Sequence, residues 1–235
     1  MSEPLQQKTT QKPAVRIGGA SYDIDMSKIP YLASFVNFQT QAQPQTKEFI
    51  HGSIPLFDVA LKGIESGYRQ CFRSLPPDLS QHHTLCDTYQ FLGVDVLGGQ
   101  SINEIFNDLK SGQSDYEREY KRYREIKGNK SKARDTAFKL LYLILLGDFM
   151  NETRDSAKVF NAVLYLVSHS ATFKWRTRKV VRAAYEERFV VSVKQTARLD
   201  EWEKKDATKL AVEDAGDVTT EEEGTDYYDD SDYSY

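Results

Sequence analysis

The hydrophobic pattern of the first fifty residues predicts a small sheet. Residues 15–17 and 20–24 both alternate apolar with polar side chains, which is typical of strands with one buried face. Gly18 and Gly19 stand between them and can adopt the positive φ angles of a two-residue hairpin turn. Residues 48–51 fit a third short strand. A hairpin plus one further strand is therefore expected.

Helices are predicted around and after these strands. Residues 29–36 favour a short helix with Pro30 in its first turn, where proline is tolerated. Residues 37–46 hold four glutamines and a proline without apolar periodicity, so a loop is expected there. Apolar residues then recur at three- and four-residue spacing over 56–64, and Gly67 fits the end of that helix.

The remaining ordered part of the sequence has only helical patterns. Leu85, Tyr89, Leu92 and Val96 mark one helical face, and Phe189–Val191 fits either the end of a helix or the start of a strand. Leu141 and Ile144 lie in the most apolar helix and are expected to be buried. Further helices are predicted over about 131–146, 155–168 and 174–185. Two more are predicted to begin at capping boxes, Ser101…Glu104 and Ser114…Glu117. The second box is followed by Tyr116, Tyr120 and Tyr123.

The order of elements in 15–97 resembles the BTB/POZ fold. The segments that carry the resemblance are the hairpin 15–24, the helix Tyr31-Leu32-Ala33-Ser34-Phe35, the strand Phe49-Ile50, the helix 57–67 with its glycine end, and the closing helix 85–95 with its Leu-Gly-Val exit. The resemblance implies a fold of short strands and helices that forms homo- or hetero-oligomers. It further implies service as a substrate adaptor of a cullin-type ubiquitin ligase.

Charge and composition divide the chain further. Residues 213–235 contain ten acidic residues, no basic residue and four tyrosines, whereas residues 1–212 hold 31 basic against 25 acidic residues, a net charge of +6. Terminal segments with few aliphatic residues cannot bury enough surface to fold. The expected class is α+β, organised as a disordered N-terminus (1–12), a BTB/POZ-like domain with a short three-stranded sheet (13–98), an all-helical extension (99–203) and an acidic disordered tail (204–235).

Candidate chemistry is sparse. His82, His83 and Cys86 are clustered, but a structural zinc site needs four ligands and only the distant Cys71 could join them. The preferred interpretation is a helix start with two exposed imidazoles and a buried thiol, so no metal and no cofactor are expected. The sequence contains no nucleophile elbow, zincin, Walker A or dinucleotide-binding motif. We therefore expect no enzyme.

Residues 174–182 place five cations beside a tryptophan. Lys174, Arg176, Arg178, Lys179 and Arg182 are the candidate contacts for an acidic partner. The simpler alternative is a helix whose apolar side docks on the core while its cations stay in solvent. Nucleic acid is not the expected partner, because the isoelectric point of 5.7 is low for a nucleic-acid-binding protein.

The function expected from these features is protein–protein interaction. The scaffold or adaptor would form homo-oligomers through an apolar set in and before the first helix, namely Ile29, Tyr31, Leu32, Phe35 and Val36. The alternative is a nuclear regulator that contacts nucleic acid through residues 174–182. The longest apolar run has seven residues (140–146), too few to cross a membrane, and the first eight residues lack the apolar core of a secretory signal. An intracellular location, cytoplasmic or nuclear, is expected.

Overall fold

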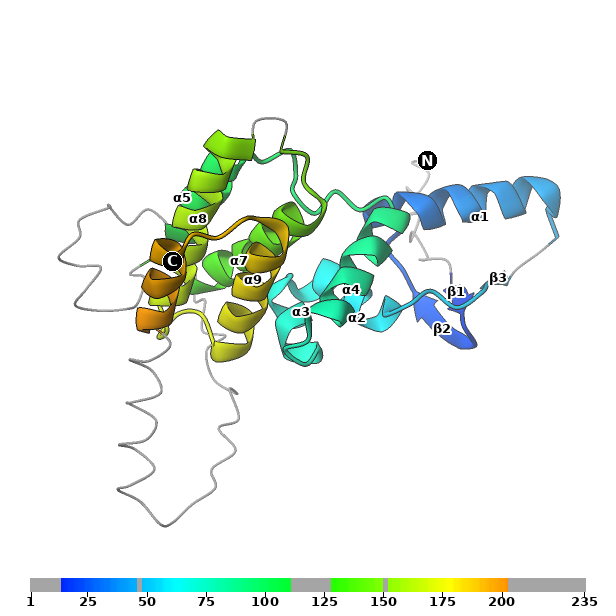
Figure 1. Ribbon diagram of the computed structural model, residues 1–235. Helices are drawn as coiled ribbons and strands as arrows, with labels where there is room; N and C mark the ends of the chain where they lie inside the picture. The colour runs from blue at the N-terminus through cyan, green and yellow to red at the C-terminus, as the bar shows by residue number, and fades with distance from the viewer. Residues whose placement is uncertain (1–13, 46–47, 111–127, 150–151, 203–235) are drawn as a thin grey trace, which may run out of the picture. The chain divides into compact units, whose positions relative to one another are not determined.

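The computed structural model describes residues 14–45, 48–110, 128–149 and 152–202. Over these residues the protein is α+β, mostly helical with one three-stranded sheet (Figure 1). The described residues up to Ser192 form one compact unit. Residues 193–202 belong to a second unit, in which they form a helix with Leu199 buried. The predicted termini, 1–12 and 204–235, and the predicted box and tyrosines at 114–123 lie outside the described residues.

The sheet consists of β1 (Ala14–Ile17), β2 (Ala20–Asp23) and β3 (Phe49–His51) in the order β2-β1-β3. The predicted hairpin is confirmed, since β1 and β2 pair antiparallel across Gly18 and Gly19, whose φ angles are +57° and +98°. β3 pairs with β1 in the parallel direction. Within the described part of the chain, β3 is therefore an edge strand.

The helix between β2 and β3 is longer than predicted. After a short 3-10 turn, η1 (Met26–Lys28), α1 runs over Pro30–Ala42 and begins at the proline as expected. The predicted loop at 37–46 is thus wrong for residues 37–42. This second half of α1 is mostly exposed, so it has no buried stripe to produce a periodic pattern, while glutamine and alanine favour helix.

Three helices follow β3: α2 (Phe57–Ser66), α3 (Arg69–Ser74) and α4 (Leu79–Phe91). Gly67 ends α2 with a φ of +94°, as predicted. Helix α3 is not among the predicted helices. Its N-terminus is held from elsewhere in the chain, because the Asp135 carboxylate accepts the backbone N–H of Arg69 at 2.7 Å.

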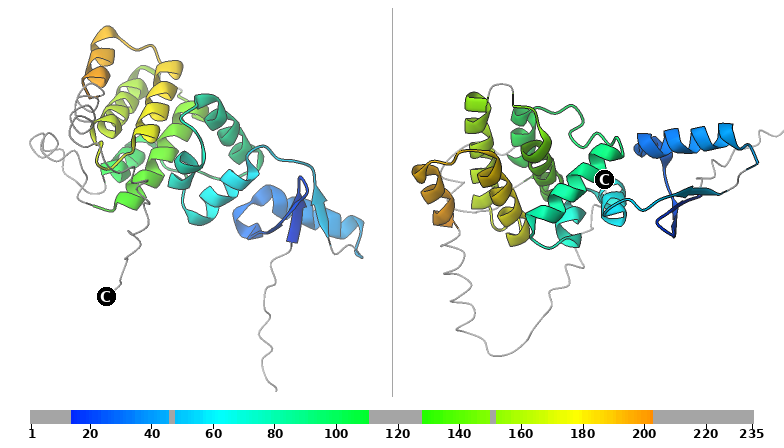
Figure 2. Two further views of the ribbon diagram at one scale, coloured as in Figure 1. Left: turned by 90° about the horizontal axis from the view of Figure 1, so that it is seen from below. Right: turned by 45° about the vertical axis from the view of Figure 1, so that its right-hand side comes forward.

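The second half is helical as predicted, with α5 (Ile102–Lys110), α7 (Lys130–Leu146), α8 (Glu152–Ser168) and α9 (Trp175–Arg188). Helices α7, α8 and α9 pack side by side (Figures 1 and 2). The Ser101 capping box is confirmed: the Glu104 carboxylate accepts the Ser101 N–H at 2.7 Å and the Ser101 hydroxyl accepts the Glu104 N–H at 3.4 Å. Residues 189–192 are irregular rather than a strand.

The packing does not divide at residues 98–99, where the sequence placed a domain boundary. The Phe138 ring of α7 stacks on Tyr68 at 5.6 Å between centroids and meets Phe72 and Tyr89 edge-on at 5.7 Å. These partners come from the predicted BTB/POZ-like half, so both predicted halves share one aromatic core. Leu141 is fully buried in the same helix, as expected.

Candidate interaction surfaces

Four aromatic rings from three segments meet at the surface around α1. The Tyr31 ring lies 4.4 Å from that of Phe91 and 5.5 Å from that of His51, and the Phe35 ring lies 5.1 Å from that of His51. The segments are α1, β3 and the last residue of α4. Ring contacts at these distances are attractive beyond the area they bury. The result is a continuous group of rings.

The spacing on α1 explains why its aromatic side chains share a face. Tyr31, Phe35 and Phe38 stand at positions i, i+4 and i+7, which fall on one side of a helix. Phe38 is 66% exposed and Phe91 is 49% exposed. The name aromatic patch is used for this set: Tyr31, Phe35, Phe38, His51 and Phe91.

A hydrogen bond ties the imidazole into the aromatic patch. Nδ1 of His51 lies 2.8 Å from the Gly52 carbonyl, which can only accept, so Nδ1 carries the proton. In the neutral ring Nε2 is then an acceptor, and the Tyr31 hydroxyl donates to it at 2.8 Å. The polar atoms of both rings are satisfied locally, which leaves mainly carbon surface facing outward.

The structure corrects the predicted self-association set. Ile29 and Leu32 have no exposed surface and belong to the core, so neither is available to a partner. Tyr31, Phe35 and Val36 remain partly exposed. Phe38, His51 and Phe91 of the aromatic patch were not in the predicted set. Only the first could have been found, from its i+3 spacing to Phe35, had the helix been extended past residue 36.

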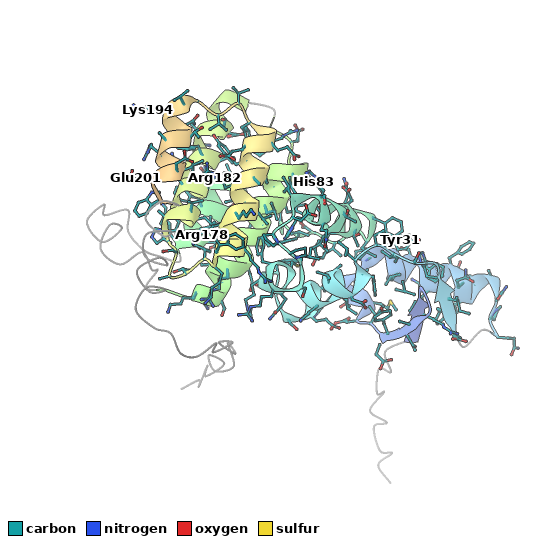
Figure 3. All side chains as sticks on the ribbon, turned by 60° about the horizontal axis from the view of Figure 1, so that its bottom comes forward. Tyr31, His83, Arg178, Arg182, Lys194 and Glu201 are labelled. Carbon is teal, nitrogen blue, oxygen red and sulfur yellow. The ribbon has the colours of Figure 1, made fainter. Side chains whose placement is uncertain are left out.

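The five predicted basic contacts differ in how exposed they are. Arg178, labelled on α9 in Figure 3, is buried. Its side chain donates to the carbonyls of Phe173 at 3.0 Å and Val167 at 3.5 Å. Arg182 is largely buried and pairs with Glu186 at 2.7 Å. Arg178 thus anchors α9 to the core, so its assignment as a partner contact is wrong, whereas the Arg182–Glu186 pair lies within α9. Lys174, Arg176 and Lys179 are exposed.

An exposed indole accompanies the three outward cations. Trp175, the first residue of α9, is 56% exposed, and the Lys179 ammonium lies 5.1 Å from the centre of its ring. Lys174, Trp175, Arg176 and Lys179 are called the basic helix surface below. Because cations and an aromatic face are adjacent there, this surface can attract anionic groups and stack on planar ones.

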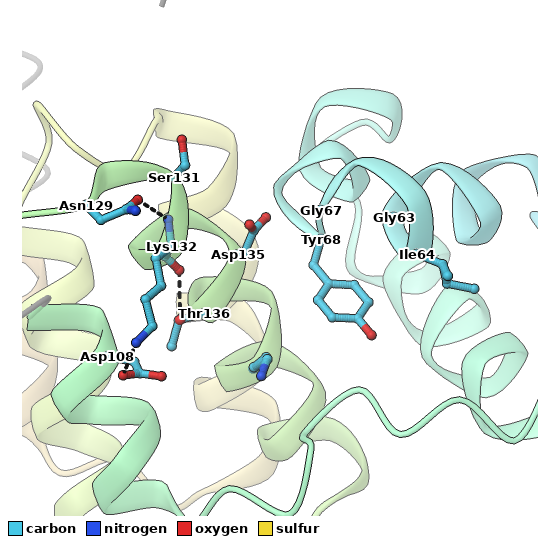
Figure 4. Close-up of a pocket in the computed structure, with 11 residues that line it drawn as sticks. Gly63, Ile64, Gly67, Tyr68, Asp108, Asn129, Ser131, Lys132, Asp135 and Thr136 are labelled. Carbon is cyan, nitrogen blue, oxygen red and sulfur yellow. Dashed lines mark hydrogen bonds and ion pairs between the residues drawn. The ribbon is translucent and has the colours of Figure 1, made fainter. Parts of the chain in front are cut away.

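A cleft of about 560 Å³ lies between the α2–α3 turn and helices α5 and α7 (Figure 4). Its charged side chains bind one another. Lys132 pairs with Asp108 at 2.8 Å, and Asp135 pairs with the Arg69 guanidinium at 2.9 Å. The Lys139 ammonium donates to the Gln100 side chain at 2.7 Å. A ligand would have to replace these contacts, so the cleft fits a polar joint between helices better than a binding site.

The clustered histidines and cysteines do not assemble a metal site. His82 is buried, contrary to the expected exposed imidazole, and its Nδ1–H donates to the Asp78 carbonyl at 2.8 Å. His83 is at the surface and pairs with Glu187. Burial raises the pKa of the Cys71 thiol to about 12, and it also raises that of Cys86, so both thiols stay protonated. No group of three ligands suited to a metal occurs among the described residues.

Comparison with known proteins adds no relative. The chain matches no protein-family model, no curated protein and no solved structure. Within the ranges that the structure describes, no helix combines the length and apolar character needed to cross a bilayer. The surfaces themselves are therefore the basis for a function.

Proposed function

We propose that this protein is a non-catalytic scaffold that self-associates through the aromatic patch. The observation that carries the proposal is the contiguous group of Tyr31, Phe35, His51 and Phe91, with the exposed Phe38 on the same face of α1. Aromatic residues that cluster on a surface are enriched at the centres of protein interfaces. Contiguous apolar area of this kind is uncommon on a protein that stays monomeric.

A second copy is the occupant that the geometry favours. β3 is an edge strand in the described chain, and the ring of its His51 lies in the aromatic patch. An edge strand and a helix face of the same patch can meet their counterparts across a two-fold axis, since such an interface uses one surface twice.

The resemblance to the BTB/POZ family gives independent support. The order of elements that carries the resemblance includes a hairpin, a helix and a third strand. In this protein the third strand, β3, lies beside β1. The family's association with oligomers agrees with self-association. In a more specific form of the proposal, the protein is a substrate adaptor of a cullin-type ubiquitin ligase. The assembled scaffold would then bind both the ligase and a substrate.

The experiment is a measurement of mass in solution on the full chain. Light scattering coupled to size exclusion should report a dimer or larger at tens of micromolar. The variant Phe38→Ser/Phe91→Ser should weaken association by about tenfold or more, because the two most exposed rings of the aromatic patch are lost from the contact.

The matched control is Val190→Ser, which removes an apolar side chain that is 99% exposed outside the aromatic patch. It should keep the native mass distribution. Circular dichroism should show the same helix content in all variants. A wild-type chain that remains monomeric at these concentrations would contradict the proposal.

A further inference from the structure

The two ends of α9 differ in charge. The basic helix surface occupies its first turns, and no acidic residue lies in the first turn. The other end holds Glu186, Glu187 and Arg188, so its charges nearly cancel, and the two glutamates pair with Arg182 and His83. The N-terminus of a helix also carries partial positive charge. Cationic side chains and the helix dipole therefore act in the same direction at this end.

The inward cations do not contribute to this surface. Arg178 is bound to backbone carbonyls in the core, which leaves Lys174, Arg176 and Lys179 facing outward. Three cations over about one and a half turns match a short run of carboxylates. A nucleic acid contact usually neutralises several more phosphates than that, and it would need a larger basic area.

Trp175 limits the choice of partner further. Its indole is 56% exposed, although a large aromatic side chain is usually buried in a monomer. An indole at the surface beside ammonium and guanidinium groups offers a face for another aromatic ring and charges for carboxylates at the same time. An acidic segment that carries tyrosines supplies both groups.

We propose that the basic helix surface binds an acidic, tyrosine-bearing peptide segment supplied by a second chain. Residues 213–235 of this protein have that composition, with ten carboxylates, four tyrosines and no cation. This gives a defined probe for the chemistry. The proposal stands apart from the aromatic patch, because it uses different residues and a different class of contact.

The test is a titration of a fluorescein-labelled synthetic peptide of residues 213–235 with the full-length protein, followed by anisotropy at low and physiological salt. The ten carboxylates of the protein's own residues 213–235 are replaced by amides, so that a second copy does not compete with the added peptide. Binding should weaken as salt rises, because the contact is exposed. The variant Trp202→Phe leaves Trp175 as the single tryptophan. In this variant the fluorescence emission of Trp175 should change with the same midpoint as the anisotropy.

Two double variants separate a local site from net charge. Arg176→Gln/Lys179→Gln should weaken binding by about fivefold, because the losses of affinity from two exposed ionic contacts multiply. Lys28→Gln/Lys62→Gln removes the same charge from exposed positions on η1 and α2, and it should change the affinity by less than about twofold. Trp175→Ala should weaken binding, while Trp175→Phe should retain it.

Three results would overturn the proposal: no binding of the peptide, equal losses in the two double variants, or tighter binding of a single-stranded oligonucleotide with the same number of charges. The last result would instead favour nucleic acid as the partner. None of these results depends on the mass of the protein in solution, so they are distinguishable from a failure of self-association.

Discussion

Gly63 shows how one buried hydroxyl group restricts a residue on a neighbouring helix. The Tyr89 hydroxyl donates to the Ala60 carbonyl of α2 at 3.1 Å, and the Cys71 thiol lies 3.3 Å from the Tyr89 hydroxyl oxygen. A Cβ atom on Gly63 would clash with this hydroxyl and come within 2.8 Å of the Cys71 sulfur. Only a glycine allows α2 to approach α3 and α4 this closely.

The first prediction follows from this contact. Gly63→Ala should destabilise the protein by about 1–3 kcal/mol, the usual cost of overpacking, although alanine in an unhindered helix is favoured over glycine by about 1 kcal/mol. Urea unfolding followed by circular dichroism measures the change. Gly52→Ala is the control, because a Cβ there meets no atom within 4 Å, and it should have little effect. A stabilised Gly63→Ala protein would contradict the packing described.

Two buried histidines make stability depend on pH. Burial lowers the pKa of His82 and of His169 below the usual value. In the unfolded chain both titrate near 6.5. Below about pH 6.5 the unfolded state binds protons that the folded state does not, so the free energy of unfolding should fall by up to about 1.4 kcal/mol per pH unit for each histidine. Above that pH their contribution is complete.

Urea unfolding between pH 5 and 8 tests this dependence. His82→Asn keeps a donor for the Asp78 carbonyl and should reduce the slope below pH 6.5 by about half. The same change at His169, whose Nδ1–H donates to the Tyr165 carbonyl at 2.7 Å, should have a similar effect. An unchanged slope in both single variants would show that other groups dominate the acid response.

At the scale of the elements, local signals predicted most of the fold. The Gly18–Gly19 turn, the Ser101 capping box and the glycine at the end of α2 each act within a few residues, so a single sequence reveals them. Helix α3 is different because its cap, Asp135, is supplied by α7. Such a cap has no signature in the neighbouring sequence. The exposed half of α1 was missed for the opposite reason, since it packs on little and has no pattern.

The interior of α7 gives an element-scale prediction. Leu141 is fully buried, whereas Leu145 in the same helix is only half-buried. Leu141→Ala should cost about 2–5 kcal/mol in unfolding free energy, because a cavity remains among closely packed neighbours. Leu145→Ala should cost clearly less. Denaturant unfolding midpoints, converted with one common m-value, measure both losses of unfolding free energy. Equal losses would show that α7 packs differently.

At the scale of the whole molecule, the candidate surfaces differ in how far sequence could predict them. The basic helix surface lies within one helix, so its cations were visible as a run, but which of them face the core depends on the carbonyls of Phe173 and Val167. The aromatic patch joins residues of α1, β3 and α4 that are up to sixty positions apart. Only the tertiary fold brings those rings together.

The shared aromatic core predicts how the molecule unfolds. Because Phe138 of α7 packs on Phe72 and Tyr89 from the other predicted half, α4 and α9 should lose protection together. Pulsed hydrogen exchange with mass spectrometry along a urea series measures each helix separately. Peptides from α4 and α9 should share one midpoint in the wild-type chain.

Phe138→Ala tests the coupling itself. Removal of this ring should lower the stability by about 3–5 kcal/mol. The change should shift the midpoints of α4 and α9 by the same amount, although the substitution lies in neither helix. Val190→Ser, at an exposed position, should shift neither. If α4 lost protection at lower urea while α9 kept its midpoint, the two halves would be separate folding units that only touch at Phe138. A common shift would instead establish that residues on both sides of 98–99 fold as one cooperative core.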